Sequence, residues 1–366
     1  DIDETFIDAT AQQLNTTYED LSIYVPALTK IKEPKLNRLG NIRYKGSYTG
    51  FLNDFVAFGT IQTNLGTVSA DINMKLPEKQ IPEYSGKLVT QGFQIGTLLD
   101  DARLGSISLN GQVAGKGFNL KELDSHFNGY VSDVAYNGYR YKDISLNGNF
   151  RKSIFTGHLQ TNDPNLRIGA LDGSIHFAGP ELAFNLDADL QYINLKALKF
   201  SKEDFQFKGK LNLNFTGNDI DHFLGSARIY EGSLIHDSTR LAFDSLRLES
   251  TLIDGNKHLS LQSNELDASL VGQFTIADLP DAFRVFLGRY YPTYVKLPNH
   301  WVKDQNFSFN IRSKNLGAYV PLFDKRLGGL NDVELNGNLD LANYELNVQA
   351  SIPELIYDGK RVTDIR

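Results

Sequence analysis

The chain has 366 residues, of which 41% are hydrophobic and 22% are charged, and this balance is typical of a folded domain. Its formal net charge of −7 argues against a nucleic-acid partner, because such binding depends on basic surface. The lack of cysteine excludes disulfides, thiolate chemistry and cysteine-based zinc sites.

The first forty residues show no clear pattern. The apolar alternation of Leu21, Ile23 and Val25 stops at Pro26. The chain begins at Asp1 without a methionine, and no apolar run approaches the roughly 20 residues needed to span a bilayer. We therefore expect a piece of a longer polypeptide, with any targeting or inner-membrane anchoring segment outside it.

From residue 41 onward, strand-length segments follow one another, separated by Gly, Asn, Asp and Ser. Five dipeptides have the composition of two-residue hairpin turns, which require positive φ at both positions. They are Asn110-Gly111, Asn137-Gly138, Asp172-Gly173, Asp254-Gly255 and Asp358-Gly359. Turns this frequent predict an antiparallel meander.

Apolar and polar residues alternate within most of these segments, so that one face of the predicted sheet is apolar and the other polar. We predict an all-β fold: an elongated, curled antiparallel sheet (a β-taco, or open groove) with short helical insertions. The residues predicted to line the apolar face are Phe184, Leu186, Leu190, Phe205, Phe207, Leu211, Leu213, Phe215, Leu266, Leu270, Phe274, Ile276, Phe307, Phe309, Ile311, Val333, Leu335, Leu339 and Leu341.

Short helices interrupt the strand series. After Pro280, the apolar residues Phe283, Phe286, Leu287 and Tyr290 have helical spacing. A second, short or 3₁₀ helix is predicted over 315–323, and smaller turns over 96–99 and 220–224. We expect their apolar faces to plug the mouth or edge of the sheet; the alternative is a lid or a membrane-contacting element.

The chain contains an irregular internal repeat. The segment 136–144 returns at 357–365 with five identities at the same spacing, and a looser copy occupies 236–246. Each copy has the pattern of a strand, a tight turn and a second strand. We divide the chain into an entry segment (1–40), continuous β-groove repeats (41–278), a partly helical insertion (279–325) and a groove continuation (326–366).

No residues form a convincing catalytic motif. The seven histidines are dispersed, which argues against a zinc or iron site. The segment 115–117 lacks the remainder of a phosphate-binding loop. Asp187 and Asp189 share a strand face, but that face is the polar, solvated one. We expect no enzymatic activity, no cofactor and no metal.

What covers the apolar face decides the function. A sandwich covers it with a second sheet, and a barrel closes it on itself. The alternation continues through most of 300 residues without a linker, which favours one long sheet; about 20 strands would extend for about 90–100 Å. Left open, an apolar trough of this kind would favour acyl chains over water.

Several stretches resemble the TamB (translocation and assembly module) group of the AsmA-like superfamily, in its Bacteroidetes form. The similarity covers most of residues 36–320. It lies in glycine and turn patterns at 46–55, 59–66, 150–171, 209–232 and 279–283.

This resemblance implies a β-taco protein of the Gram-negative periplasm, anchored in the inner membrane by a segment outside this chain. It also implies bridge-like transfer of glycerophospholipids and a role in outer-membrane biogenesis. The implied partners are phospholipid acyl chains and a BamA-like barrel of the outer membrane.

Three hypotheses follow. In the first, the chain is a lipid conduit, in which Leu213→Asp or Phe274→Asp blocks the acyl path while Asn212→Asp is tolerated. In the second, it is a chaperone-like scaffold that pairs an exposed edge strand with nascent outer-membrane barrels. In the third, it is an adhesin or structural module built of dry β-sandwiches.

Overall fold

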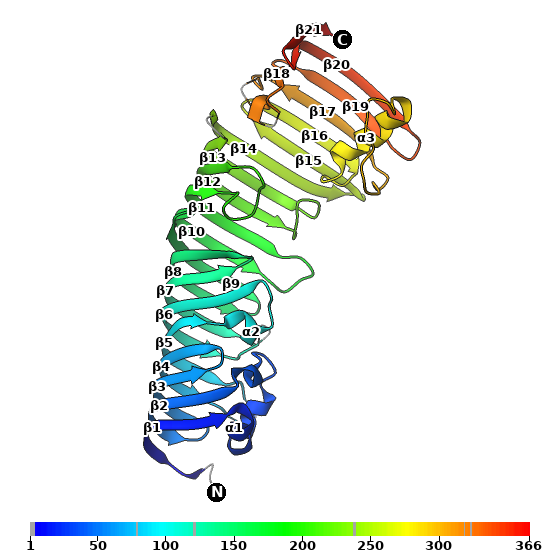
Figure 1. The fold of residues 1–366 in the computed structure, drawn as a ribbon. Helices are drawn as coiled ribbons and strands as arrows, with labels where there is room; N and C mark the ends of the chain where they lie inside the picture. Colours follow the sequence, from blue (N-terminus) through cyan, green and yellow to red (C-terminus); the bar gives the residue numbers. More distant parts are fainter. Residues whose placement is uncertain (1–3, 78–79, 120–121, 237–238, 318, 323) are drawn as a thin grey trace. The chain divides into compact units, whose positions relative to one another are not determined.

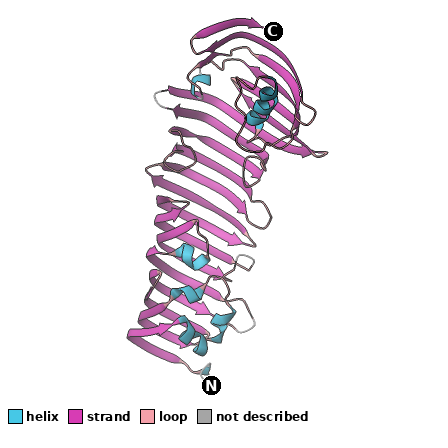
Figure 2. Cartoon of the chain, turned by 45° about the vertical axis from the view of Figure 1, so that its right-hand side comes forward, coloured by secondary structure: helices cyan, strands magenta, loops and turns pink. Residues whose placement is uncertain are grey.

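The computed structural model describes residues 4–77, 80–119, 122–236, 239–317, 319–322 and 324–366. The 21 strands of these residues belong to one open antiparallel sheet, accompanied by a few short helices (Figures 1 and 2). The prediction of an all-β, open antiparallel fold with short helical insertions is confirmed. The chain divides into two units: residues 1–179 with 188–202, and residues 180–187 with 203–366.

In the first unit, each strand pairs antiparallel with the next one along the chain. Its elements are β1 (Ile7–Thr17), α1 (Tyr18–Tyr24), η2 (Pro26–Lys30), η3 (Leu36–Leu39), β2 (Asn41–Phe51), β3 (Asp54–Thr63), β4 (Gly66–Lys75), β5 (Glu83–Phe93), α2 (Ile95–Leu99), β6 (Leu104–Lys116), β7 (Asp124–Tyr136), β8 (Tyr139–Arg151), β9 (Ile154–Asp163) and β10 (Leu166–His176). Strand β11 (Ala183–Asn194) contributes residues to both units. The sheet therefore begins with β1, inside the segment that showed no clear sequence pattern.

The second unit continues the meander with one exception: β17 pairs directly with β19, because the three-residue strand β18 pairs with the far end of β20. Its elements are β12 (Phe205–Thr216), β13 (Leu224–His236), β14 (Thr239–Ile253), β15 (Asn256–Ser263), β16 (Leu266–Gln273), α3 (Leu279–Tyr290), β17 (Asn306–Ser313), η4 (Val320–Leu322), β18 (Leu327–Gly329), β19 (Glu334–Asp340), β20 (Glu345–Tyr357) and β21 (Lys360–Ile365).

Three of the five predicted hairpin turns are present. Asn137-Gly138, Asp254-Gly255 and Asp358-Gly359 each join two strands, with φ between 48° and 79° as such turns require. The predictions at Asn110-Gly111 and Asp172-Gly173 are wrong, because these dipeptides lie inside β6 and β10. In β6, Gly111 leaves room for the ring of Phe127 on the neighbouring strand, which occupies the space that a side chain would need.

The helix predicted after Pro280 is confirmed as α3, and the turn at 96–99 falls in α2. Within the segment 315–323, for which a short or 3₁₀ helix is predicted, the structure has the 3₁₀ helix η4. Residues 318 and 323 of that segment lie outside the described residues. Residues 220–223 form no helix and lead directly into β13. The repeat copies at 136–144 and 357–365 are both hairpins, whereas 237–238 of the third copy lie outside the described residues.

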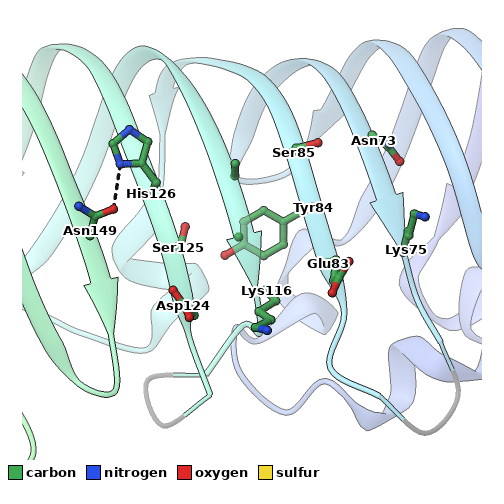
Figure 3. A pocket seen from close by; sticks show the side chains of 12 residues that line it. Asn73, Lys75, Glu83, Tyr84, Ser85, Lys116, Asp124, Ser125, His126 and Asn149 are labelled. Atoms are coloured by element: carbon green, nitrogen blue, oxygen red, sulfur yellow. Dashed lines mark hydrogen bonds between the residues drawn. The ribbon is translucent and has the colours of Figure 1, made fainter.

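Bulges bend the strands. In β5 the register shifts between Thr90 and Phe93, where Gly92 has φ of 61°, and in β12 it shifts between Lys208 and Lys210. An extra residue on one strand bends it and increases its twist. Figure 3 shows β4, β5, β7 and β8 curving along their lengths, with polar side chains on the face nearest the viewer.

A row of alternating charge crosses six strands on the polar face of the first unit. Its members lie directly opposite one another from β3 to β8: Asp54, Lys75, Glu83, Lys116, Asp124 and Arg151. The end pairs approach to 3.5 Å (Lys75 Nζ to Asp54 Oδ2) and 3.3 Å (Arg151 Nε to Asp124 Oδ2). Opposite charges across strands stabilise the pairing, and here they also specify the register.

We expect Lys116→Glu to lower the free energy of unfolding of the first unit by about 1–2 kcal/mol, because it replaces two attractive cross-strand pairs by two repulsive ones. Hydrogen exchange of the β5–β7 amides in urea measures the loss, which should shrink in high salt. Lys45→Glu is the matched control, since Thr60 lies opposite Lys45. Equal effects of the two variants would contradict the role of the charge row.

Candidate functional site

The apolar face of the first unit carries no charged side chain over a wide area. Cross-strand register groups its residues into four rows, which start in β3 at Phe55, Ala57, Gly59 and Ile61 and run to β9. The row from Ala57 continues through Ile72, Gly86, Val113, Phe127, Gly148 and Gly157. None of the four rows contains Asp, Glu, Lys, Arg or His. This surface is called the apolar face below. The name also covers the face of the second unit's strands that carries the predicted lining residues.

Aromatic rings lie flat across glycines on this face. A Cβ built on Gly148 would lie 2.6 Å from the ring of Phe155, and one built on Gly111 would lie 2.7 Å from the ring of Phe127. The same arrangement joins Gly337 to Phe309 in the second unit, at 2.7 Å. A ring above a glycine stays close to the sheet, so these positions form a low, smooth aromatic surface.

Gly148→Ala should lower the free energy of unfolding of the first unit by about 1–3 kcal/mol, because the new methyl group displaces the Phe155 ring. Adding Phe155→Leu should restore part of the loss, since a smaller side chain leaves room for the methyl group. Chemical denaturation followed through the amides of β8 and β9 measures both variants. If the double variant loses more free energy of unfolding than the two single variants together, the Phe155 ring does not limit the space at Gly148.

The chain exposes more surface than compact proteins of its mass do. The chain exposes 21662 Å² at a mass of 41.0 kDa. A compact protein of that mass would expose about 14,700 Å², and two separate compact bodies of half the mass about 17,700 Å². Among the described residues, 17 hydrophobic side chains are buried, although 41% of 366 residues are hydrophobic. The described strands also form one sheet, whereas the sandwich hypothesis requires two packed face to face.

Tyrosines on the apolar face remain neutral. Tyr48 stacks on Phe55 with 4.8 Å between ring centroids, and burial raises the pKa of Tyr48 to about 12. Burial also raises the pKa values of Tyr84 and Tyr141. The phenols therefore contribute no charge to this face near neutral pH.

In the second unit, helix α3 covers part of the apolar face. Ala282 of the helix is completely buried against Phe307 and Leu339, whose exposed fractions are 2% and 0%. The Phe283 ring stands edge-on to Phe307 and Phe309, at 6.2 and 6.1 Å. The apolar side of α3 thus occupies the surface of β17 and β19.

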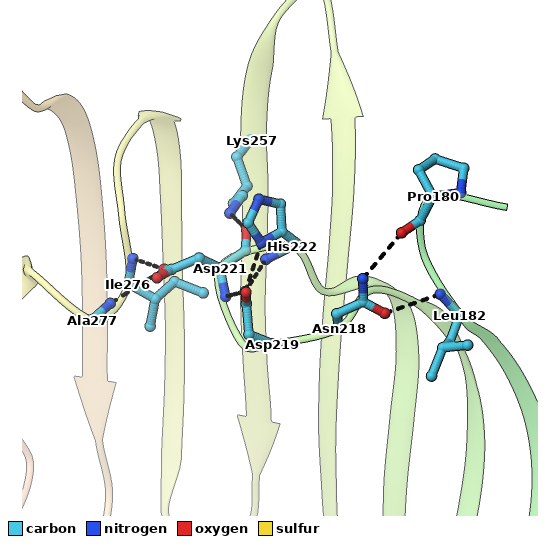
Figure 4. Close-up of polar contacts among 9 residues, drawn as sticks. All are labelled: Pro180, Leu182, Asn218, Asp219, Asp221, His222, Lys257, Ile276 and Ala277. Carbon is cyan, nitrogen blue, oxygen red and sulfur yellow. Dashed lines mark hydrogen bonds and ion pairs between the residues drawn. The ribbon is translucent and has the colours of Figure 1, made fainter. Parts of the chain in front are cut away.

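A loop between β12 and β13 holds the segment that leads from β16 into α3, through the contacts of Asp221 (Figure 4). The Asp221 carboxylate accepts hydrogen bonds from the backbone N–H groups of Ile276 and Ala277, the latter at 3.2 Å. The Lys257 ammonium donates to the Asp221 carbonyl and lies 5.6 Å from the centre of the Phe274 ring. These contacts fix the chain between β16 and the helix.

The structure separates the predicted lining residues into two groups. One group is packed in or against the core beneath α3: Leu270, Phe274, Phe307, Phe309, Ile311, Leu335, Leu339 and Leu341. The other is outside that core: Phe184, Leu186, Leu190, Phe205, Phe207, Leu211, Leu213, Phe215, Leu266, Ile276 and Val333. Of this second group, Leu190 and Val333 are buried and the rest are partly exposed.

Four of the predicted lining residues lie outside the strands. Strand β16 ends at Gln273, so Phe274 and Ile276 belong to the connection to α3. Val333 precedes β19, and Leu341 follows it. The connection leaves the strand because Phe274 turns into the core beneath α3, with its ring edge-on to Phe307 at 5.6 Å.

Sequence reasoning missed the apolar face of the first unit. Rows such as Phe55–Met74–Tyr84 were overlooked because glycines interrupt the alternation in β5, β6 and β8. The interrupting glycines themselves indicate this face. They stand two residues from an aromatic or aliphatic residue of their own strand, so both positions face the same side of the sheet.

The polar face carries open hollows lined mainly by polar side chains. A hollow of about 470 Å³ lies on this face in the first unit. Figure 3 shows some of its lining residues, among them His126, Asn149 and members of the charge row. His126 Nδ1 and Asn149 Oδ1 are 3.0 Å apart, a cross-strand contact. Asp187 and Asp189 are both exposed, and Asp187 accepts a hydrogen bond from Asn212 at 2.8 Å.

Within the described residues, no group of three acidic, histidine or cysteine side chains could hold a metal ion. Among the same residues, none of the helices has both the length and the apolar character that crossing a bilayer requires. Comparison with protein-family models, curated proteins and solved structures gives no match.

Proposed function

We propose that this chain is a non-enzymatic lipid-transfer protein that binds the acyl chains of glycerophospholipids on the apolar face of its sheet. The observation that carries the proposal is the uncharged apolar face from β3 to β9, where most side chains remain partly exposed and no second sheet of the described residues covers them. A methylene group that is fully removed from water gains about 0.8 kcal/mol, so even partial burial on such a surface favours acyl chains. The tyrosines of the face stay neutral, so no ionised phenol opposes an acyl chain.

The cellular setting of the proposal rests on the resemblance to the TamB group. We propose that the protein acts in the periplasm, between the inner and outer membranes, and contributes to outer-membrane biogenesis with a BamA-like barrel partner. No side chain takes part in a reaction in this mechanism, because lipids would move down their own gradient along a surface of nearly uniform polarity.

Lipid analysis of protein purified without detergent tests the proposal. We expect phospholipids to co-purify, to be detected by native mass spectrometry, and to exchange with a fluorescent phospholipid added in vesicles. Protein that is strictly free of lipid and takes up none would refute it. Pairing of added outer-membrane strands with such lipid-free protein would favour the chaperone-like scaffold instead.

A further inference from the structure

The end of α3 and the segment that links it to β17 expose a group of large amphipathic side chains. Its members, called the 290–301 surface, are Tyr290, Tyr291, Tyr294, Leu297 and Trp301, which are between 57% and 88% exposed. Trp301 is the only tryptophan of the chain. Single exposed apolar residues are ordinary, but five within twelve positions are an unusual concentration, and two of them, Tyr294 and Leu297, line one hollow.

The segment is folded against the helix. The backbone N–H groups of Tyr294 and Val295 donate to the Tyr291 carbonyl, both at 3.0 Å, and form a turn. A Cβ built on Gly288 would lie 2.7 Å from Leu297 Cδ2, so Leu297 packs directly over the helix backbone. Tyr294 and Leu297 line one hollow together with Arg284 of the helix. These side chains are therefore presented by a folded segment.

The charge of this segment differs from that of the rest of the chain. Between Tyr290 and Lys303 there are two cationic residues, Lys296 and Lys303, and no acidic residue, although the chain has 44 acidic residues and a net charge of −7. Both lysines are exposed. Acidic residues lie at its margins, since Asp304 follows Lys303 and His300 lies 3.5 Å from Asp278. The two exposed lysines still give the segment itself a local positive charge, which favours an anionic partner.

The tyrosine hydroxyls and the Trp301 indole N–H have no hydrogen-bond partner within the described part of the chain. Rings with a polar tip and an apolar body are enriched where a bilayer meets water, because the tip stays hydrated while the ring enters the headgroup region. Lysines beside them add electrostatic attraction to anionic lipids.

We propose that the 290–301 surface docks on the interface of an anionic phospholipid bilayer. The proposal does not depend on lipid transfer, because these side chains lie on the connection after α3 and not on the apolar face of the sheet. Docking would bring the second unit to a membrane surface without a membrane-spanning helix. Tyr294, Leu297 and Trp301 would enter the headgroup region, and Lys296 and Lys303 would contact lipid phosphates.

The fluorescence of Trp301 reports directly on this contact, since no other tryptophan contributes. With vesicles of phosphatidylglycerol and phosphatidylcholine, we expect a blue shift of the emission, quenching by brominated acyl chains, and a weaker response in high salt or with phosphatidylcholine alone. The double variant Tyr294→Ser/Leu297→Ser keeps the probe and should lower vesicle affinity by roughly tenfold. Phe58→Ser, at a residue 63% exposed in β3, is the control and should leave the affinity unchanged.

Three outcomes would overturn the proposal: no spectral response to either vesicle, an unchanged response in the double variant, or a shift that depends on protein concentration without lipid. The last outcome would identify the surface as an interface between two copies of the chain. The variant Leu213→Asp separates this docking from lipid transfer, because it should lower lipid binding by the second unit while the Trp301 response to vesicles persists.

Discussion

Leu213→Asp should reduce phospholipid binding by the second unit at least roughly tenfold, the largest functional effect that we expect from one substitution. Leu213 lies on β12 between Leu211 and Phe215 on the apolar face, with Ala227 opposite, and its side chain is partly exposed. A carboxylate there can stay hydrated only while the face is empty. An acyl chain laid across it would have to desolvate the charge, at a cost of several kcal/mol.

The control is the next residue along the strand. Asn214 is exposed on the polar face, opposite Ser226, so Asn214→Asp adds the same charge without touching the acyl path. Asn212 is a poorer control than the sequence indicated, because it donates a hydrogen bond to Asp187 and a carboxylate there would repel that group.

Uptake of a fluorescent phospholipid from vesicles measures the effect, on variants whose unfolding midpoints match that of the parent protein. Leu213→Ser, a milder change, should lose less lipid than Leu213→Asp. Folded Leu213→Asp protein that retains normal uptake would exclude the apolar face of β12 as the binding surface, and the proposed function would fail for the second unit.

The sequence predicts which face of each strand is apolar, because alternation with period two is a local property. It does not predict what covers that face. Phe205 and Phe207 in β12 have the same spacing as Phe307 and Phe309 in β17, yet the first pair is partly exposed and the second is buried beneath α3. That difference depends on where the helix packs, a contact between distant residues that no local pattern encodes.

Turn chemistry shows a similar limit. Asn137-Gly138 and Asn110-Gly111 are identical dipeptides, but one turns a hairpin and the other lies inside β6. The distinguishing feature is Phe127 on the neighbouring strand, whose ring lies over Gly111. A glycine that permits a turn also permits close approach of a ring, and only the cross-strand partner decides between the two uses.

The second large effect concerns the core beneath α3, where Leu339→Ala should lower the free energy of unfolding of the second unit by about 2–5 kcal/mol. Leu339 is 0% exposed, lies opposite Phe307 and Leu346 on the neighbouring strands, and belongs to the core that includes Ala282 of the helix. Truncating it removes methyl contacts and leaves a cavity that the paired strands cannot collapse to fill.

Leu252→Ala makes the same chemical change at a residue 59% exposed in β14 of the same unit, and it should cost less than about 0.5 kcal/mol. Hydrogen exchange of the β17 and β19 amides in urea measures both variants. Equal losses would mean that α3 adds little to the stability of these strands. A large loss confined to Leu339→Ala would instead assign the helix-covered core as the stabilising element of the second unit, leaving β12 to β15 free to keep their apolar surface exposed.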